Sequence, residues 1–375
     1  MIATALGLLL VGFVISVPMT ALLVRLGARW KTLDSAGAAG HAKVLRGVPN
    51  IGGIAIFVSV ALPLAGGLAL ISFGRSDWAL MLEPMVEPYV GRMRESLPFG
   101  WAFLGGMLVF HLVGLFDDRR ALPAKLKLGI ELAVAAVLAV HFDARLLVVL
   151  DDWGFAGTAL SVALSMLWIA GVANAMNFLD NMDGLAAGTA IIAGSLFLAA
   201  AIIVDQWFIA GVLALLVGGI AGFLPQNFPL RGGARIFMGD GGSLVIGYVL
   251  AVMTIRTTFT ETQNPSYALG SAWYGVFMPL VILAVPLYDF VAVSTIRLSQ
   301  GRSPFVGDQQ HLSHRLVDRG LTRRQAVLVI WALAFITGVG GVSLGTVAPW
   351  QAALIGVQVV ATLLVLGVLE GTLRK

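Results

Sequence analysis

Two adjacent aspartates, Asp117 and Asp118, lie in the segment "GLFDDRRALPAKLK" at 114–127. Neighbouring carboxylates repel each other unless a cation lies between them or water screens them. Hard divalent cations such as Mg²⁺ take oxygen ligands and often bridge to substrate phosphates. The pair therefore predicts a Mg²⁺ site or a general base. The alternative is a solvated helix end that Arg119 and Arg120 neutralise.

A second polar motif, "NAMNFLDNMDGLAAG" at 174–188, repeats a polar residue every three positions: Asn174, Asn177, Asp180 and Asp183. Each step of three residues turns an α-helix by about 300°, so four members cannot share one face. We expect the two asparagines on the last turn of a helix and the two aspartates in the connection that follows. The alternative for Asp183 is a cap on the next helix.

Asp240 lies in "MGDGGSL", directly before an apolar segment. Glycines let backbone N–H groups approach a ligand closely, and a helix N-terminus favours anions. This junction suits a pyrophosphate bridged by a cation that Asp240 holds. The alternative is that Asp240 or Ser243 only caps the helix.

His311 and His314 are three residues apart and are followed by Arg315, in a loop with several further arginines. Arg makes planar, bidentate hydrogen bonds to phosphate, and His can donate or transfer a proton. The loop therefore predicts phosphate binding. A basic segment that rests on anionic lipid headgroups would explain the charges, but it explains the histidines poorly.

Two ionisable residues, Glu131 and Asp289, fall inside apolar segments, where a charge is costly and is a functional candidate by default. Lys127 precedes Glu131 by one helical turn, so we expect these two residues to pair. Asp289 is expected toward the end of its segment that faces the loop of His311, within reach of that loop.

Apolar helices must position all of these groups. Of 375 residues, 58% are hydrophobic and 12% are charged, against roughly 25% charged residues in a soluble domain. The composition predicts an all-α, polytopic membrane protein with one domain over 1–375, and it excludes an ordinary soluble protein. Cysteine is absent, which excludes disulfides and thiolate sites, and no nucleic-acid binding is expected.

We predict about eleven spans, at 2–24, 51–73, 99–116, 124–142, 158–175, 184–204, 206–223, 242–259, 273–296, 326–346 and 351–371.

The charges of the loops predict the orientation. Of the 24 Lys and Arg residues, 19 fall in one alternate set of loops and 5 in the other. Positive charge stays on the cytoplasmic side, so the N-terminus is expected outside and the C-terminus in the cytoplasm. The polar motifs all fall in the loops of the cytoplasmic set, which predicts an active site on that face. We find no internal repeat of the kind that many secondary transporters have.

The ordered motifs "FDD", "NAMNFLDNMDGLAAG", "FMGDGGS" and "HLSHRL" resemble the polyprenyl-phosphate N-acetylhexosamine-1-phosphate transferase superfamily, glycosyltransferase family 4. Within it, the chain is most similar to the bacterial undecaprenyl-phosphate N-acetylglucosaminyl-1-phosphate transferases, over residues 34–316. The resemblance implies transfer of a sugar 1-phosphate from a UDP-sugar to a membrane polyprenyl phosphate. It also implies release of UMP and a requirement for Mg²⁺ or Mn²⁺. The enzyme would lie in the bacterial inner membrane and would catalyse the first step in the synthesis of a cell-envelope polysaccharide such as O-antigen. A homodimer is an open alternative.

The resemblance also implies roles for single residues. The catalytic residues would be Asp117, near the lipid phosphate, together with Asp118, His311 and His314. Asp240, with Asp118, would bind the metal. Lys127 matches the basic position after the aspartate pair. The phosphates or the sugar would be bound by His311, His314 and Arg315. Phe237 would stack on the uracil. The nucleotide pocket would consist of Asn174, Asn177, Asp180, Asp183, Asn227 and Phe237.

The loop of His311 departs from the family pattern. Ser313 replaces the middle histidine of the common His-Leu-His-His-Arg. We expect His311, His314 and Arg315 to suffice and a histidine at position 313 to change the rate little. The alternatives are a phospho-MurNAc-pentapeptide transferase, a branch specific for another amino sugar, and a secondary transporter with an intramembrane site at Asp289.

Overall fold

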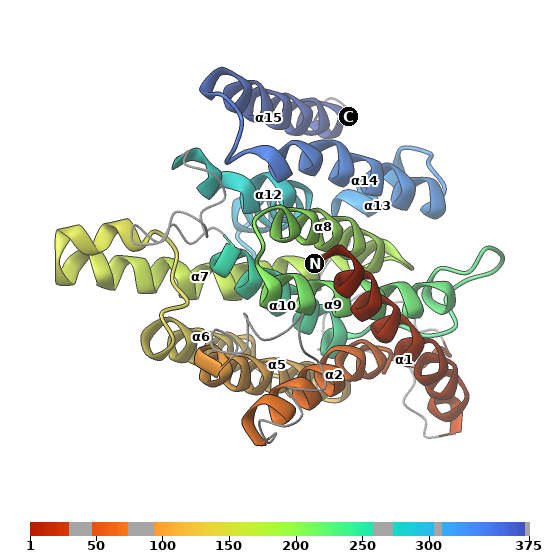
Figure 1. The fold of residues 1–375 in the computed structure, drawn as a ribbon. Helices are drawn as coiled ribbons and strands as arrows, with labels where there is room; N and C mark the ends of the chain where they lie inside the picture. Colours follow the sequence, from red (N-terminus) through yellow and green to blue (C-terminus); the bar gives the residue numbers. More distant parts are fainter. Residues whose placement is uncertain (30–46, 74–93, 258–272, 304–309, 372–375) are drawn as a thin grey trace.

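The computed structural model describes residues 1–29, 47–73, 94–257, 273–303 and 310–371. These ranges contain helices and no strand, as the composition predicts. Figure 1 shows the arrangement. The helices are α1 (Ile2–Arg29), α2 (Gly53–Phe73), α5 (Leu97–Arg119), α6 (Ala124–His141), α7 (Phe155–Leu179), α8 (Leu185–Ile203), α9 (Trp207–Asn227), α10 (Asp240–Thr257), α11 (Met278–Ile282), α12 (Ala284–Ser299), α13 (Leu312–Asp318), α14 (Arg323–Gly338) and α15 (Pro349–Gly371), with short 3₁₀ turns η1 (Val148–Trp153), η3 (Trp273–Phe277) and η4 (Val339–Ser343).

Within the described ranges, eight helices are long and apolar enough to cross a membrane. A ninth span is formed if the pair Tyr274–Ile282 and Ala284–Ser299, bent by 71°, counts as one. Each of the eleven predicted intervals holds a helix, but α6 and α10 are not among these spans. Both carry charge: α6 contains Lys125, Lys127 and Glu131, and α10 begins at Asp240 and ends beside Arg256. The count of eleven and the orientation therefore remain predictions.

Helix α10 lies at the centre of the bundle (Figure 1) and packs against α2, α5, α7, α8 and α9. Its residues from Leu244 to Met253 are all buried. Close approach at its N-terminal end depends on glycine: a Cβ on Gly114 would lie 2.4 Å from the backbone of Asp240, and one on Gly53 would lie 2.3 Å from Gly242 N. These contacts hold the start of α10 against the end of α5 and the start of α2.

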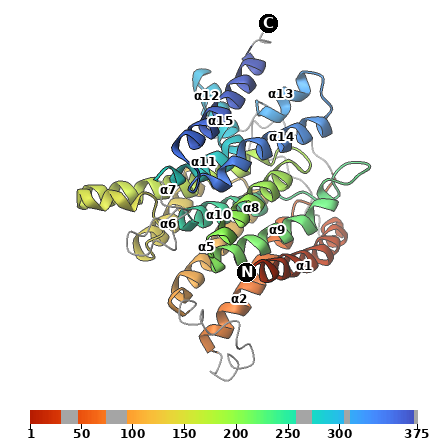
Figure 2. The same ribbon diagram turned by 45° about the horizontal axis from the view of Figure 1, so that its top comes forward.

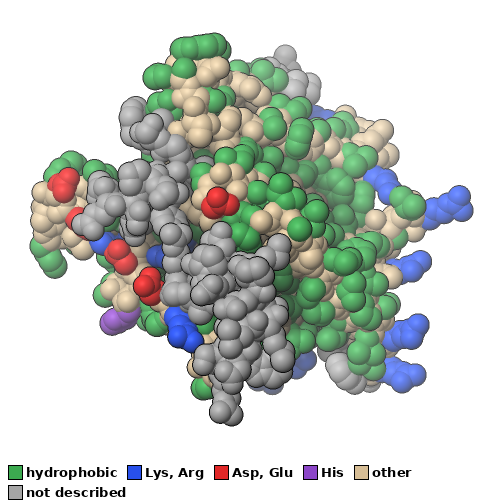
Figure 3. All heavy atoms as spheres, in the orientation of Figure 1, with side chains coloured by type: hydrophobic (Ala, Val, Ile, Leu, Met, Phe, Trp, Pro, Cys, Tyr) green, Lys and Arg blue, Asp and Glu red, His purple; other side chains and the backbone are tan. Residues whose placement is uncertain are grey.

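The N-terminal and C-terminal helices lie on opposite sides of this centre (Figure 2). Helix α1 packs along α9, where a Cβ on Gly218 would lie 2.0 Å from Leu9 O and one on Gly12 would lie 2.4 Å from Leu215 O. Small residues at membrane helix interfaces allow such close backbone contact. Figure 3 shows a largely apolar face with a row of Lys and Arg side chains along one edge, whereas acidic, basic and histidine side chains are mixed near the opposite edge. An excess of Lys and Arg at one end is typical of helices that cross a bilayer.

Candidate active site

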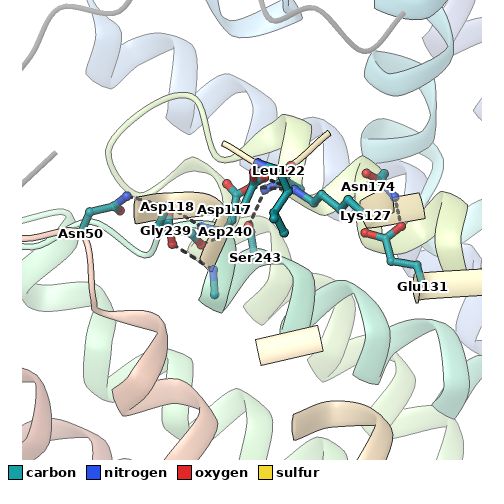
Figure 4. A network of polar contacts seen from close by, with 12 residues as sticks. Asn50, Asp117, Asp118, Leu122, Lys127, Glu131, Asn174, Gly239, Asp240 and Ser243 are labelled. Carbon is teal, nitrogen blue, oxygen red and sulfur yellow. Dashed lines mark hydrogen bonds and ion pairs between the residues drawn. The ribbon is translucent and has the colours of Figure 1, made fainter. Parts of the chain in front are cut away.

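Lys127 joins two of the predicted acidic residues (Figure 4). Its Nζ donates to Asp117 Oδ2 at 2.8 Å and to Asp240 Oδ2 at 2.6 Å. Asp117 lies near the end of α5, Lys127 in the first turn of α6, and Asp240 at the start of α10. The structure thus brings the motif at 114–127, which holds Asp117 and Lys127, against the motif that holds Asp240. We call Asp117, Asp118, Lys127 and Asp240 the carboxylate cluster.

Asp118 holds the N-terminus of α10 in place. Its Oδ1 accepts from Asn50 Nδ2 at 2.8 Å and from the backbone N–H of Asp240 at 3.1 Å, and its Oδ2 accepts from Gly241 N–H at 3.2 Å. The first N–H groups of a helix lack partners inside the helix, so a carboxylate there stabilises the helix start. The capping that we offered as an alternative for Asp240 or Ser243 comes from Asp118 instead.

The two asparagines lie on the last turns of α7, as predicted, and face different helices. Asn177 Nδ2 donates to Ser243 Oγ in α10 at 3.0 Å. Asn174 Nδ2 donates to Glu131 Oε2 in α6 at 2.5 Å. The expected pairing of Lys127 with Glu131 is wrong, because the ammonium group turns to Asp117 and Asp240 and Asn174 takes its place at Glu131.

The connection from α7 to α8 is tied to the loop before α10. Asn227 is buried, and its Oδ1 accepts from Gly184 N–H at 2.8 Å while its Nδ2 donates to Ile236 O at 2.9 Å. Asp183 Oδ2 accepts from Ala234 N–H at 3.0 Å. The cap position of α8 belongs to Gly184, which has a φ of 78° and no side-chain cap, so the alternative of Asp183 as a cap is wrong.

Asp180 and Phe237 lie at the borders of these segments, and both are half-buried. Asp180 follows the last residue of α7, where its N–H donates to Asn177 O at 3.2 Å. The backbone N–H of Phe237 donates to Pro49 O at 2.8 Å, beside Asn50. The predicted roles of these residues and of Asn227 at a nucleotide remain predictions.

A second group of polar residues surrounds Asp289 in α12. His311 Nδ1 lies 2.8 Å from Asp289 Oδ2, and Leu312 N–H donates to Asp289 Oδ1 at 2.6 Å. Arg315 Nη2 is 3.8 Å from Asp289 Oδ1. The expectation that Asp289 lies within reach of the His311 loop is confirmed. His314 is half-buried, and burial lowers its pKa below the ordinary value of 6.5, as do the charges of His311 and Arg323.

The end of α7 contacts both groups. Asn177 faces α10, whereas the ring of the next residue, Phe178, packs edge-on against His311 with 5.7 Å between ring centroids. Asn181 Oδ1 accepts from the Ser313 hydroxyl at 2.5 Å. Asn50, Asn181 and Ser313 were not among the predicted site residues, because each finds its partner far away in the chain.

The described ranges contain no group of three or more His, Asp or Glu side chains already arranged as a metal site. The donor set still fits a divalent cation. Lys127 Nζ contacts the carboxylates of Asp117 and Asp240, and the carboxylate of Asp118 lies against the backbone N–H of Asp240. Among the described residues, Glu131 Oε1 is buried without a hydrogen-bond partner. Closely spaced carboxylates with too little positive charge favour a bound cation.

The sequence has relatives among known proteins. The sequence model for glycosyl transferase family 4 matches residues 100–258. The decaprenyl-phosphate N-acetylglucosaminephosphotransferase of Mycolicibacterium smegmatis is 30% identical over 336 aligned residues, covering 84% of this chain and 77% of the relative. The chain belongs to glycosyl transferase family 4.

A second relative, the undecaprenyl-phosphate alpha-N-acetylglucosaminyl 1-phosphate transferase of Escherichia coli, is 27% identical over 303 aligned residues, covering 78% of this chain and 72% of the relative. The match to the family model contains the whole carboxylate cluster, whereas His311, His314 and Arg315 lie beyond it. Membership of family 4 makes this chain a phosphosugar transferase with several membrane helices.

Proposed function

We propose that this transferase moves N-acetylglucosamine 1-phosphate from its UDP-sugar to undecaprenyl phosphate on the cytoplasmic face of the bacterial inner membrane. The products are the lipid diphosphate sugar and UMP, and the lipid product starts a cell-envelope polysaccharide. The contacts of Lys127 with Asp117 and Asp240 carry this proposal, because they place a cation and two carboxylates at the meeting point of three helix ends. The names of the relatives support the sugar and the lipid.

The reaction joins two anions, so the site must offset their repulsion. Phosphoryl transfer depends mainly on positioning and on electrostatic stabilisation. Asp240 and Asp118 are the proposed ligands of Mg²⁺ or Mn²⁺, which when bound would neutralise the phosphates. Lys127 supplies a fixed positive charge beside the same carboxylates.

Asp117 suits a positioning role. Its Oδ1 accepts from Leu122 N–H at 2.7 Å, and its Oδ2 accepts from Lys127. The hydrogen bonds to both oxygens hold the carboxylate of Asp117 in place and reduce its nucleophilicity, which favours a positioning role over formation of a covalent aspartyl phosphate. We favour direct attack by an oxygen of the lipid phosphate on the phosphorus that bears the sugar. One P–O bond forms to the lipid phosphate, and the bond to the UMP phosphate breaks.

The acceptor needs no strong base, because a phosphate monoester with a second pKa near about 6 is largely ionised at neutral pH. UMP leaves as an anion and needs no proton from an acid. His311, His314 and Arg315 are therefore proposed to bind phosphate or sugar groups rather than to be required as proton donors. The connection from α7 to α8 and the loop before α10 are proposed to form the nucleotide pocket, with the half-buried ring of Phe237 at the uracil.

Purified protein with Mg²⁺, undecaprenyl phosphate and a panel of labelled UDP-sugars tests the proposal. We expect UMP release together with a labelled lipid, fastest with UDP-N-acetylglucosamine, and almost no product from Asp240→Asn. Transfer only from UDP-MurNAc-pentapeptide or from another amino sugar would reassign the branch. Uptake of a solute without any UMP would instead indicate a transporter.

A further inference from the structure

Asp289 is a buried carboxylate in the middle of an apolar helix. Its side chain is 2% exposed, and its neighbours Val285 and Val293 in α12 are also buried. A buried charge is destabilising unless it is paired and hydrogen-bonded. Asp289 contacts His311, Leu312 and Arg315, which lie together at the start of α13.

The carboxylate holds two consecutive residues at once. One oxygen accepts from the ring of His311 and the other from the backbone N–H of Leu312, at 2.8 and 2.6 Å. The second contact satisfies the first free N–H of α13, for which His311 is the capping position. The position of the imidazole is therefore set relative to its own backbone as well as to α12.

Phe178 contacts the same ring from a third side. It packs edge-on against His311 at 89°, while Arg297 stacks over Phe178 at 5.1 Å and Phe290 lies 5.2 Å from it. The side chain of His311 is 7% exposed. With these contacts the ring has little freedom to rotate.

We propose that Asp289 is a positioning residue that fixes the orientation and the tautomer of His311. An ionised carboxylate only accepts hydrogen bonds, so Nδ1 of His311 must carry the proton. Nε2 is then the ring nitrogen with which His311 binds the sugar nucleotide. This inference rests on the proposed function for its ligand, but the tautomer of His311 follows from the contact with Asp289 alone.

The variant Asp289→Asn distinguishes control of the His311 tautomer from a role of Asp289 in packing alone. The amide keeps the shape and keeps one oxygen for Leu312 N–H, but it presents an NH₂ group that cannot accept from Nδ1–H. The ring then carries its proton on Nε2. We expect kcat/KM for the UDP-sugar to fall at least tenfold, as in His311→Ala, and the double variant to lose no more than His311→Ala alone. The matched control is Asp318→Asn, which removes an exposed carboxylate at the C-terminal end of α13, the helix that begins at Leu312. This variant should keep the wild-type rate.

A second readout does not depend on turnover. The chain has five histidines, so ¹⁵N-histidine labelling gives few signals, and His311 is assigned by its loss in His311→Ala. We expect Nδ1 to be protonated in the wild type and Nε2 in Asp289→Asn. Protonation of Nε2 in the wild type, or rate losses that multiply in the double variant, would overturn the inference. A wild type that turns over no UDP-sugar would instead overturn the proposed function.

Discussion

The hydroxyl of Ser313 donates to Asn181 Oδ1, which joins α13 to the connection between α7 and α8. These residues are 132 positions apart in the chain. Ser313 is 1% exposed, so it faces the interior and not the phosphate groups that its neighbours are expected to bind. A histidine at this position, which we expect to change the rate little, would have to fit into a packed interior.

Ser313→His is now expected to destabilise the protein. Inserting a larger side chain into a packed interior costs about 1–3 kcal/mol, whereas Ser313→Ala loses one hydrogen bond, worth about 1 kcal/mol. Thermal unfolding in detergent should rank the wild type above Ser313→Ala and Ser313→Ala above Ser313→His. Ser303→His, at an exposed serine, is the control. A Ser313→His variant with unchanged unfolding temperature and rate would show that the site has room for the ring.

Asp240→Asn is expected to abolish most turnover while the fold persists. An amide binds Mg²⁺ far more weakly than a carboxylate, and the hydrogen bond from Lys127 loses its charged acceptor. The rate at low Mg²⁺ should fall by more than about 100-fold, because changing a residue that only supports a metal ligand already costs about 10–100-fold and Asp240 is the proposed ligand itself. Asp152→Asn removes an exposed carboxylate from η1 and should leave the Mg²⁺ dependence unchanged. A near-normal rate for Asp240→Asn at low Mg²⁺ would refute its role as a ligand.

Much of the fold follows from local pattern. The apolar segments predict a helix in each of the eleven intervals, because apolar length is a property of the sequence alone. Contacts between distant residues are not encoded in local spacing. Lys127 lies one turn from Glu131 but bonds to Asp240, 113 residues away, and Asn50 reaches Asp118 across 68 residues. Such contacts depend on how glycines such as Gly114 let α5 and α10 meet. The motifs therefore identified candidate residues, but not their partners.

The buried position of His314 predicts a pH dependence of stability. Burial holds the pKa of His314 in the folded protein below 6.5. As the pH falls, His314 therefore takes up a proton in the unfolded chain at a higher pH than in the folded protein. The free energy of unfolding should then decrease with falling pH, starting near pH 6.5 and continuing below it. His314→Gln should reduce this decrease between about pH 7 and 5, as measured by thermal unfolding. His141→Gln, at an exposed histidine at the end of α6, should leave the curve unchanged, and an identical curve for His314→Gln would contradict the prediction.

The orientation is testable because the chain has no cysteine of its own. A cysteine introduced at Ser303, which is exposed after α12, should be shielded from an impermeant thiol reagent in intact cells. One introduced at Asp152, which is exposed in η1, should react. Both should react in lysed cells. The reverse pattern would place the carboxylate cluster on the outer face and remove its access to cytoplasmic UDP-sugars.

Arg315→Ala is expected to weaken the use of the UDP-sugar. Its guanidinium group lies 3.8 Å from Asp289 Oδ1, next to His311, so it is oriented by the same carboxylate that holds the ring. A hydrogen bond from a charged donor contributes about 1.5–3 kcal/mol, which corresponds to a loss of about 10–150-fold in kcat/KM.

The role of Arg315 is identified by which substrate, the UDP-sugar or the lipid phosphate, shows the changed KM in Arg315→Ala. If the guanidinium group binds the donor phosphates, KM for the UDP-sugar should rise while KM for the lipid phosphate stays constant. Arg319→Ala removes a positive charge one turn further along the chain and serves as the control for a general electrostatic effect. Equal losses in the two variants would indicate a basic surface that attracts anions without specific contact. Full activity of Arg315→Ala would exclude Arg315 from the phosphate-binding groups.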